Sequence, residues 1–152
     1  QFWFRFVLPN LSYLETGRTA VVEKRIREHF IDGHVAHVYK DVCRERLWGL
    51  ADSGELGFVP ERVGRWWSGS DEIDVVGLSA SEGRAVWGEC KFWKDPVGAN
   101  VLRALEEKAV RVPWERDRRT DAFALFSASG FTDELWEIAA ARGDVVLVED
   151  SE

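Results

Sequence analysis

Two neighbouring apolar segments constrain the fold of this chain more than any other feature. EIDVVGLS (residues 72–79) and AVWGECKFW (residues 85–93) are rich in aliphatic and aromatic residues, and only ASEGR (residues 80–84) separates them. The pattern predicts two strands, and so short a connection is typical of an antiparallel hairpin. The second strand nevertheless carries Glu89 and Lys91 inside its apolar run, and these charges need an explanation.

Other segments predict helices and strands on both sides of the hairpin. Apolar residues at helical spacing, or capping residues at both ends, predict helices over residues 19–30, 34–54, 99–112 and 132–143. Short aliphatic and aromatic runs predict strands over residues 62–67, 121–129 and 144–150. The order is helix, helix, three strands, helix, strand, helix, strand, which favours an α/β fold with a mixed central sheet flanked by helices.

Length and composition favour one domain in the cytoplasm. The 152 residues suit a single core, which usually takes about 100–200 residues, and we expect an extended segment over residues 1–18 and the domain over residues 19–152. No apolar run approaches the ~18–20 residues of a membrane span, so no membrane partner is expected. The two cysteines are typical of a reducing compartment. The absence of methionine predicts that the chain is part of a longer protein.

Strand alternation places the charges of the hairpin on one face. Glu89 and Lys91 share a face with Trp87 and Trp93, and the residues between them form an apolar face that is expected to be dry. If the register is simple, Ile73 and Val75 continue the dry face, and Glu72 and Asp74 point to the charged one. Asp74, Glu89 and Lys91 are therefore expected to converge.

Converging carboxylates require a proton or a cation between them. A divalent metal with oxygen ligands, such as Mg²⁺, meets that requirement, and a lysine beside it can orient a water and offset charge on a phosphoryl oxygen. Glu-x-Lys alone is a common pattern that also suits a surface ion pair. Together with Asp74 on the adjacent strand, it indicates hydrolysis of phosphodiesters.

The two segments resemble a known nuclease superfamily. EIDVVGL followed by AVWGECKFW is similar to the Asp…Glu-x-Lys core of PD-(D/E)XK nucleases, whose restriction-endonuclease-like fold also has the predicted order of elements. FWFRFVLPN, DVCRERL and GECKFW further resemble a domain of unknown function at the C-terminus of archaeal-type ATPases. That resemblance implies that residues 1–18 join an upstream ATPase with a winged helix, and that DNA is the substrate.

The resemblance assigns roles to individual residues of the hairpin. It implies that Asp74 and Glu89 bind Mg²⁺ or Mn²⁺ together with the carbonyl of Cys90, and that Lys91 is the catalytic lysine.

An acidic residue on the preceding helix usually completes such a site. Here the expected Phe-Glu pair is replaced by Tyr39-Lys40. Asp41 and Glu45 are the alternatives, and Glu45 is favoured because the triplet CRE (residues 43–45) is retained. If the ammonium of Lys40 enters the site instead, it will compete with the metal.

Arginine beside tryptophan suggests contacts with nucleic acid. Arg65, Arg116, Arg118 and Arg119 lie in such segments, which can hold phosphates and stack bases. Solvated arginines beside core tryptophans are the alternative interpretation. The formal net charge of −7 disfavours non-specific coating of DNA. Three histidines lie at positions 29, 34 and 37, and His34 and His37 can share a helix face as metal ligands. The absence of paired cysteine or carboxylate spacing favours helix-end or solvated histidines instead.

Two hypotheses for the function remain open at this level. The first is a Mg²⁺- or Mn²⁺-dependent DNA nuclease in which Asp74, Glu89, Lys91 and Glu45 are catalytic. The alternative is a degenerate module with the same fold that binds DNA, a partner or a second copy of itself next to the ATPase. Whether a helix carboxylate or Lys40 meets Asp74 discriminates between them.

Overall fold

The computed structural model describes residue 12 and residues 15–150, and the chain divides into two compact units, Gln1–Val38 and Tyr39–Glu152. The predicted extended segment, residues 1–18, lies largely outside the described residues. The first unit contains α2 (Thr19–His29) and the π-helical segment η3 (Phe30–Val35). The sequence predicts helices over residues 19–30 and 34–54 with a break at Gly33 between them. That break is wrong, because Gly33 lies within η3 and α3 (Ala36–Asp52) follows directly. A π-helical turn accommodates the irregularity without ending the helix.

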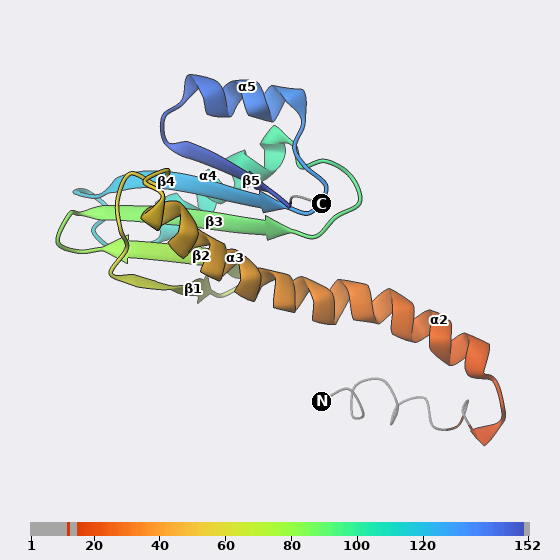
Figure 1. Ribbon diagram of the computed structural model, residues 1–152. Coiled ribbons are helices and arrows are strands. Elements are labelled where there is room, and N and C mark those ends of the chain that lie inside the picture. Colours follow the sequence, from red (N-terminus) through yellow and green to blue (C-terminus); the bar gives the residue numbers. More distant parts are fainter. Residues whose placement is uncertain (1–11, 13–14, 151–152) are drawn as a thin grey trace. The chain divides into compact units, whose positions relative to one another are not determined.

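The second unit is built on a five-stranded mixed sheet (Figure 1). The strands are β1 (Arg62–Ser68), β2 (Asp71–Ser79), β3 (Arg84–Lys91), β4 (Thr120–Ser127) and β5 (Val145–Glu149). They lie side by side in sequence order; the first three are antiparallel, and β3, β4 and β5 are parallel. Helix α4 (Ala99–Arg111) connects β3 to β4, and α5 (Asp133–Ala141) connects β4 to β5. The predicted α/β class and order of elements are confirmed.

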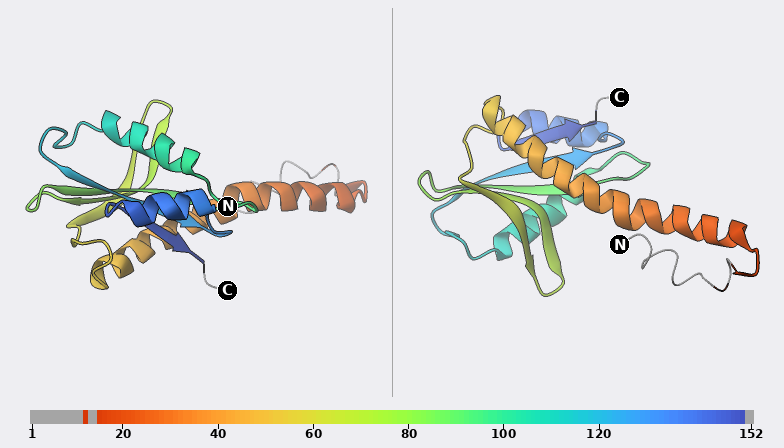
Figure 2. Two further views of the ribbon diagram at one scale, coloured as in Figure 1. Left: turned by 90° about the horizontal axis from the view of Figure 1, so that it is seen from above. Right: turned by 60° about the horizontal axis from the view of Figure 1, so that its bottom comes forward.

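Helices cover both faces of the sheet within this unit (Figure 2). One core cluster joins α4 and α5 to residues such as Trp87 and Leu125, and the other joins α3 to residues such as Val86 and Phe126. The prediction of a single dry face in the hairpin is therefore wrong. Trp87 is on the predicted charged face but is fully buried under α4, because an amphipathic helix covers this face as well.

Regular pairing of the hairpin stops at the point where its charges begin. The ladder between β2 and β3 runs from Ser79–Arg84 to Val75–Gly88. On the other side of β2, the register shifts between Gly64 and Trp66 of β1. Asp74 and Glu89 are thus the first residues beyond the last pair, at the end of the sheet where β3 terminates.

The register of β2 is not the simple one assumed above. Ile73 packs in the cluster under α4, whereas Val75 packs in the cluster under α3 and Val76 is again under α4. Strict alternation cannot put Ile73 and Val76 on one face, so β2 is irregular at Asp74. This irregularity lets the Asp74 side chain approach α3.

Candidate functional site

Six charged side chains lie near the end of the β2–β3 hairpin in two groups of three, one toward α3 and one toward α4, and we call them together the lysine–carboxylate cluster. The strands contribute the carboxylates and one lysine, and each flanking helix contributes a further lysine. The members are Lys40 of α3, Glu72 and Asp74 of β2, Glu89 and Lys91 of β3, and Lys108 of α4. All belong to the second unit.

Asp74 is held by a lysine and by the backbone of the neighbouring strand. Its Oδ1 lies 2.6 Å from the Nζ of Lys40, and its Oδ2 accepts a hydrogen bond of 3.0 Å from the backbone N–H of Cys90. The same Lys40 ammonium donates to Oε1 of Glu72 at 3.2 Å. Both oxygens of the Asp74 carboxylate are therefore occupied by donors from the protein.

Glu89 has two lysine partners on the other side of the sheet. Lys91 donates to its Oε1 at 2.7 Å, as expected for side chains two residues apart on a strand. Lys108 reaches its Oε2 at 3.4 Å from the last turn of α4. Glu89 is buried like Asp74. Each of its two carboxylate oxygens accepts a hydrogen bond from one of these lysines, which balances its charge.

The cluster is electrically balanced. Three carboxylates face three ammonium groups, which satisfies the requirement that buried charges be paired. Partial burial of Lys40 lowers its pKa, but hydrogen bonds and charge attraction from Asp74 and Glu72 outweigh this effect and raise the pKa above its usual value. Lys40 is therefore charged at neutral pH.

The side chains present do not fit a divalent cation. Mg²⁺ and Mn²⁺ require several oxygen ligands in close coordination, but the groups nearest to the carboxylates of Asp74 and Glu89 are lysine ammonium groups, which supply positive charge instead of further oxygen ligands. Among the described residues, no group of three or more His, Cys, Asp or Glu side chains is placed to hold a metal. The positive charge that these carboxylates need is supplied by lysines.

Neither helix carboxylate expected at the site reaches it. Asp41 is exposed and pairs with Arg44, and Glu45 is exposed. Helix geometry explains the difference: residue 45 lies two positions after buried Cys43 and so points away from the sheet, whereas Lys40 lies one turn before Cys43 on nearly the same side. Position 40, rather than 41 or 45, faces Asp74.

Cys90 contributes its backbone to the site and buries its side chain. A hydrogen bond with Cys43 and burial both raise the pKa of the Cys90 thiol, so this group stays protonated. A buried, neutral thiol is neither a nucleophile nor a metal ligand. The two cysteines instead pack α3 against β3.

Arg119 cannot bind a phosphate as the sequence suggested. Its side chain is 2% exposed and stacks on Trp87, with the guanidinium carbon 4.7 Å from the ring centre. The guanidinium donates to Asp121 and to three backbone carbonyl groups, those of Ala109, Val112 and Trp114. With these donors used inside the fold, Arg119 is a structural residue.

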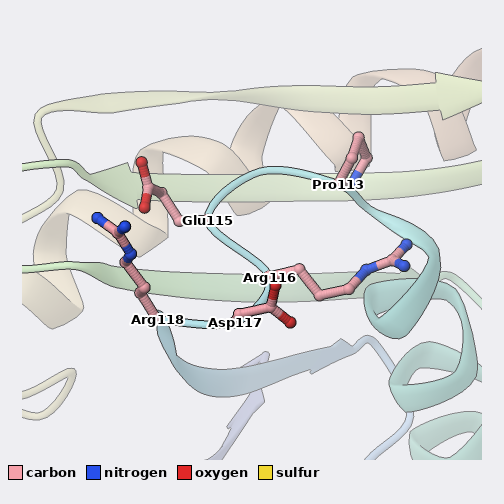
Figure 3. A pocket seen from close by; sticks show the side chains of 5 residues that line it. All are labelled: Pro113, Glu115, Arg116, Asp117 and Arg118. Atoms are coloured by element: carbon pink, nitrogen blue, oxygen red, sulfur yellow. The ribbon is translucent and has the colours of Figure 1, made fainter.

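Arg116 and Arg118 are exposed but are remote from the cluster. They line an open pocket in the loop between α4 and β4 together with Pro113, Glu115 and Asp117, and they point in different directions (Figure 3). This loop leads to Thr120, which pairs with Arg84 at the start of β3. Glu89 and Lys91 lie at the other end of β3, roughly 20 Å away at about 3.3 Å per residue. One phosphate cannot contact both sites.

Two exposed tryptophans flank the cluster, each beside a cation. Trp67 is 64% exposed and pairs across the strands with Glu72, and the Arg65 guanidinium lies 4.9 Å from its ring centre. Trp93 is 47% exposed, and the ammonium of Lys91 lies 5.0 Å from its ring centre. These pairs provide apolar, cationic surface at the same end of the sheet as the cluster.

Sequence reasoning missed Lys108. The sequence contains a weak signal for it, because Lys108 follows buried Leu105 by three positions and precedes buried Ala109, so its stem lies beside the buried face of α4. No sequence pattern indicates which strand residue it meets.

The histidines at positions 34 and 37 are exposed.

Comparison with known proteins identifies the family of the chain. Residues 3–111 match DUF234, a family described as archaeal and bacterial proteins of unknown function. The chain belongs to this family. The DUF234 match extends to the end of α4 and so includes every member of the lysine–carboxylate cluster.

One curated relative is substantially longer than this DUF234 chain. An uncharacterised protein of Methanocaldococcus jannaschii, MJECL04, is 34% identical over 94 residues, which cover 62% of this chain and 20% of that protein. No solved structure matches the chain. Among the described residues, no helix has both the length and the apolar character required to cross a membrane.

Proposed function

We propose that this chain is a restriction-endonuclease-like module that binds nucleic acid without hydrolysing it, and that it works next to an ATPase on a longer polypeptide. The observation that carries the proposal is the contact between Lys40 and Asp74, at 2.6 Å. A site that hydrolyses phosphodiesters with metal ions needs carboxylate oxygens free for coordination. In this cluster those oxygens are engaged by ammonium and backbone donors.

The fold supports the nuclease-like part of the proposal. An α-helix precedes an antiparallel β1–β2–β3 meander, and two parallel strands follow through α4 and α5. Asp74 and the Glu89-x-Lys91 motif lie at the same end of β2 and β3, which is the arrangement that the resemblance implies. The 20% coverage of the longer relative is compatible with an additional ATPase region, which stays part of the proposal.

Unpaired bases are the ligand that the surface fits best. Aromatic side chains that stack on bases contribute about 1–3 kcal/mol each, and Trp67 and Trp93 are exposed beside Arg65 and Lys91. Flat aromatic surface with local positive charge suits single-stranded DNA or RNA. The formal net charge of −7 repels the rest of the backbone, so we expect weak binding that salt reduces further.

A metal-dependent DNA nuclease is the second candidate. It is favoured by the proximity of Asp74, Glu89 and Lys91, the residues expected to be catalytic, at one end of the sheet. For this function Lys40 would have to leave Asp74.

Cleavage and binding assays on the 152-residue chain test the two candidates. Supercoiled and single-stranded DNA are incubated with Mg²⁺ or Mn²⁺, and binding of a fluorescent single-stranded oligonucleotide is measured by anisotropy. We expect no cleavage, and at least about 5-fold weaker binding for Trp67→Ala and Trp93→Ala, from the lower limit of the stacking energy. Trp136→Ala is the matched control, because Trp136 is similarly exposed but lies on α5.

Two outcomes would reject the proposal. Metal-dependent cleavage that disappears in both Asp74→Ala and Lys91→Ala would establish the nuclease instead. No detectable oligonucleotide binding at low salt, or equal weakening by Trp136→Ala, would reject the base-binding surface.

A further inference from the structure

The ammonium of Lys40 has the position and the charge of a bound cation. It reaches from α3 to two carboxylates of β2, at 2.6 Å from Asp74 and 3.2 Å from Glu72. Only 24% of the Lys40 side chain and 6% of the Asp74 side chain are exposed. The contact is thus shielded from water and linked to a fixed position of the helix.

The surrounding packing fixes Lys40 in this place. Tyr39 and Cys43, on either side of it along α3, are buried in the core cluster under the sheet. Tyr39 also contacts the ring of Phe92, with 5.4 Å between ring centres. Because its neighbours are anchored, α3 cannot rotate to offer Asp41 or another carboxylate without disrupting this core.

The same packing prevents a divalent ion from binding to Asp74 while Lys40 stays in place. An ion at Asp74 would lie beside the Lys40 ammonium, and like charges that close repel strongly at a partly buried site. It would also have to compete for Oδ2 with the N–H group of Cys90. Displacing Lys40 would leave its own charge without the Asp74 partner.

We infer that Lys40 is the built-in cation of this site, which replaces a divalent metal, and that a carboxylate at position 40 would turn the cluster into a metal site. The side chain of Lys40→Glu would start from the same backbone position and face Asp74 and Glu72, giving three carboxylates around the volume that the ammonium occupies. The inference rests on the proposed function in one respect, that the site at Asp74 needs no metal. Its test uses neither nucleic acid nor activity, so the two can fail separately.

The test measures binding of Mn²⁺ alone to the 152-residue chain. Free Mn²⁺ is followed by electron paramagnetic resonance during a titration, and melting temperatures are recorded with Mn²⁺ and with EDTA. We expect one Mn²⁺ per Lys40→Glu chain, bound at least 10-fold tighter than any ion on the natural chain, whose melting temperature should not respond to either reagent.

Three further variants make the result specific. Lys40→Glu combined with Asp74→Asn should lose the gain, because a ligand is removed. Arg103→Glu makes the same change of charge at an exposed position of α4 away from the cluster and should bind like the natural chain. Lys40→Gln removes the ammonium without adding a charge, and its melting temperature should rise with Mn²⁺ even if Lys40→Glu fails to fold.

The inference would be overturned by one Mn²⁺ bound to the natural chain in a manner that Asp74→Asn abolishes. It would equally be overturned if Lys40→Glu stays folded and gains no more Mn²⁺ affinity than Arg103→Glu. If Lys40→Glu does not fold, an unchanged melting temperature of Lys40→Gln in Mn²⁺ would overturn it.

Discussion

Arg119 provides a quantitative test of how the sheet and α4 are held together. Its guanidinium spans the end of α4, the following loop and the first residues of β4, through hydrogen bonds of 2.6–2.8 Å. The cation also stacks on fully buried Trp87, whose indole N–H donates to the same Asp121 carboxylate at 2.9 Å. Truncation of this one side chain therefore affects three segments of the chain at once.

The expected loss for Arg119→Ala is large for a single substitution. Removing one partner of a buried charge pair costs about 3–5 kcal/mol. The carbonyl of Ala109 keeps a donor in the backbone N–H of Val112, whereas the carbonyls of Val112 and Trp114 each cost about 1 kcal/mol when they lose theirs. Two effects offset this sum: the Asp121 side chain is 33% exposed and can be rehydrated, and about 2 kcal/mol of side-chain entropy is recovered. We expect the free energy of unfolding to fall by about 3–4 kcal/mol.

Urea denaturation followed by tryptophan fluorescence measures this change. Arg118→Ala is the matched control, because it removes an arginine at the adjacent, exposed position, and it should change the free energy of unfolding by less than about 0.5 kcal/mol. Arg119→Lys should recover only part of the loss, because an ammonium cannot form the same planar set of bonds. A loss below about 1 kcal/mol for Arg119→Ala, the usual effect of an ordinary substitution, would refute the structural role assigned to Arg119.

Three further predictions concern the backbone, a helix cap and pH. Gly88→Ala should destabilise the fold by about 1–3 kcal/mol, because the added Cβ would lie 2.9 Å from the Cβ of Val75 in β2. Gly49→Ala should stabilise it by about 0.5–1 kcal/mol, because Gly49 lies in α3 with open space around it. Equal melting temperatures of the two variants and the natural chain would contradict both predictions. Thr132→Ala should lower the free energy of unfolding by about 1 kcal/mol, since the Thr132 hydroxyl caps α5, and an unchanged urea midpoint would argue against that cap. Hydrogen bonds from Arg142 lower the pKa of Asp144, so their stabilising effect should be complete above the ordinary carboxyl pKa and lost as the pH falls through the lowered value. Asp144→Asn should therefore reduce the fall in melting temperature on the acid side. If the melting temperatures of the variant and of the natural chain depend on pH in the same way, Asp144 does not contribute.

Much of the fold follows from the sequence because its signals are local. The hairpin turn, the helical spacing of α4 and the capping threonine before α5 each act within a few residues, and the structure has all three. The apolar run over residues 121–129 correctly indicated the strand β4, whose residues pack in the core clusters on both faces of the sheet. The helix break expected at Gly33 is wrong because an isolated glycine can be accommodated in a π-helical turn.

The cluster was less predictable because it depends on contacts between distant elements. Alternation within the β3 sequence was enough to pair Glu89 with Lys91. It could not show that β2 is irregular at Asp74, which moves that side chain toward α3, or that α4 covers Trp87. The contact between Lys40 and Asp74 joins residues 34 positions apart. The sequence indicated only that the Lys40 ammonium would compete with a metal if it entered the site.

The packing around the cluster explains why this chain needs Asp74 and Glu89 even without catalysis. Lys40 connects Asp74 to the helix under one face of the sheet, and Lys108 connects Glu89 to the helix over the other. Removal of Asp74 would leave Lys40 with Glu72 alone, and removal of Glu89 would take the carboxylate partner from both Lys91 and Lys108, at a cost of as much as about 3–5 kcal/mol. The carboxylates therefore have a structural role that is independent of any reaction. Both carboxylates are therefore expected to be retained whether or not the site binds a metal, so the presence of Asp74 and Glu89 cannot by itself establish activity, whereas the sign of the charge at position 40 bears directly on it.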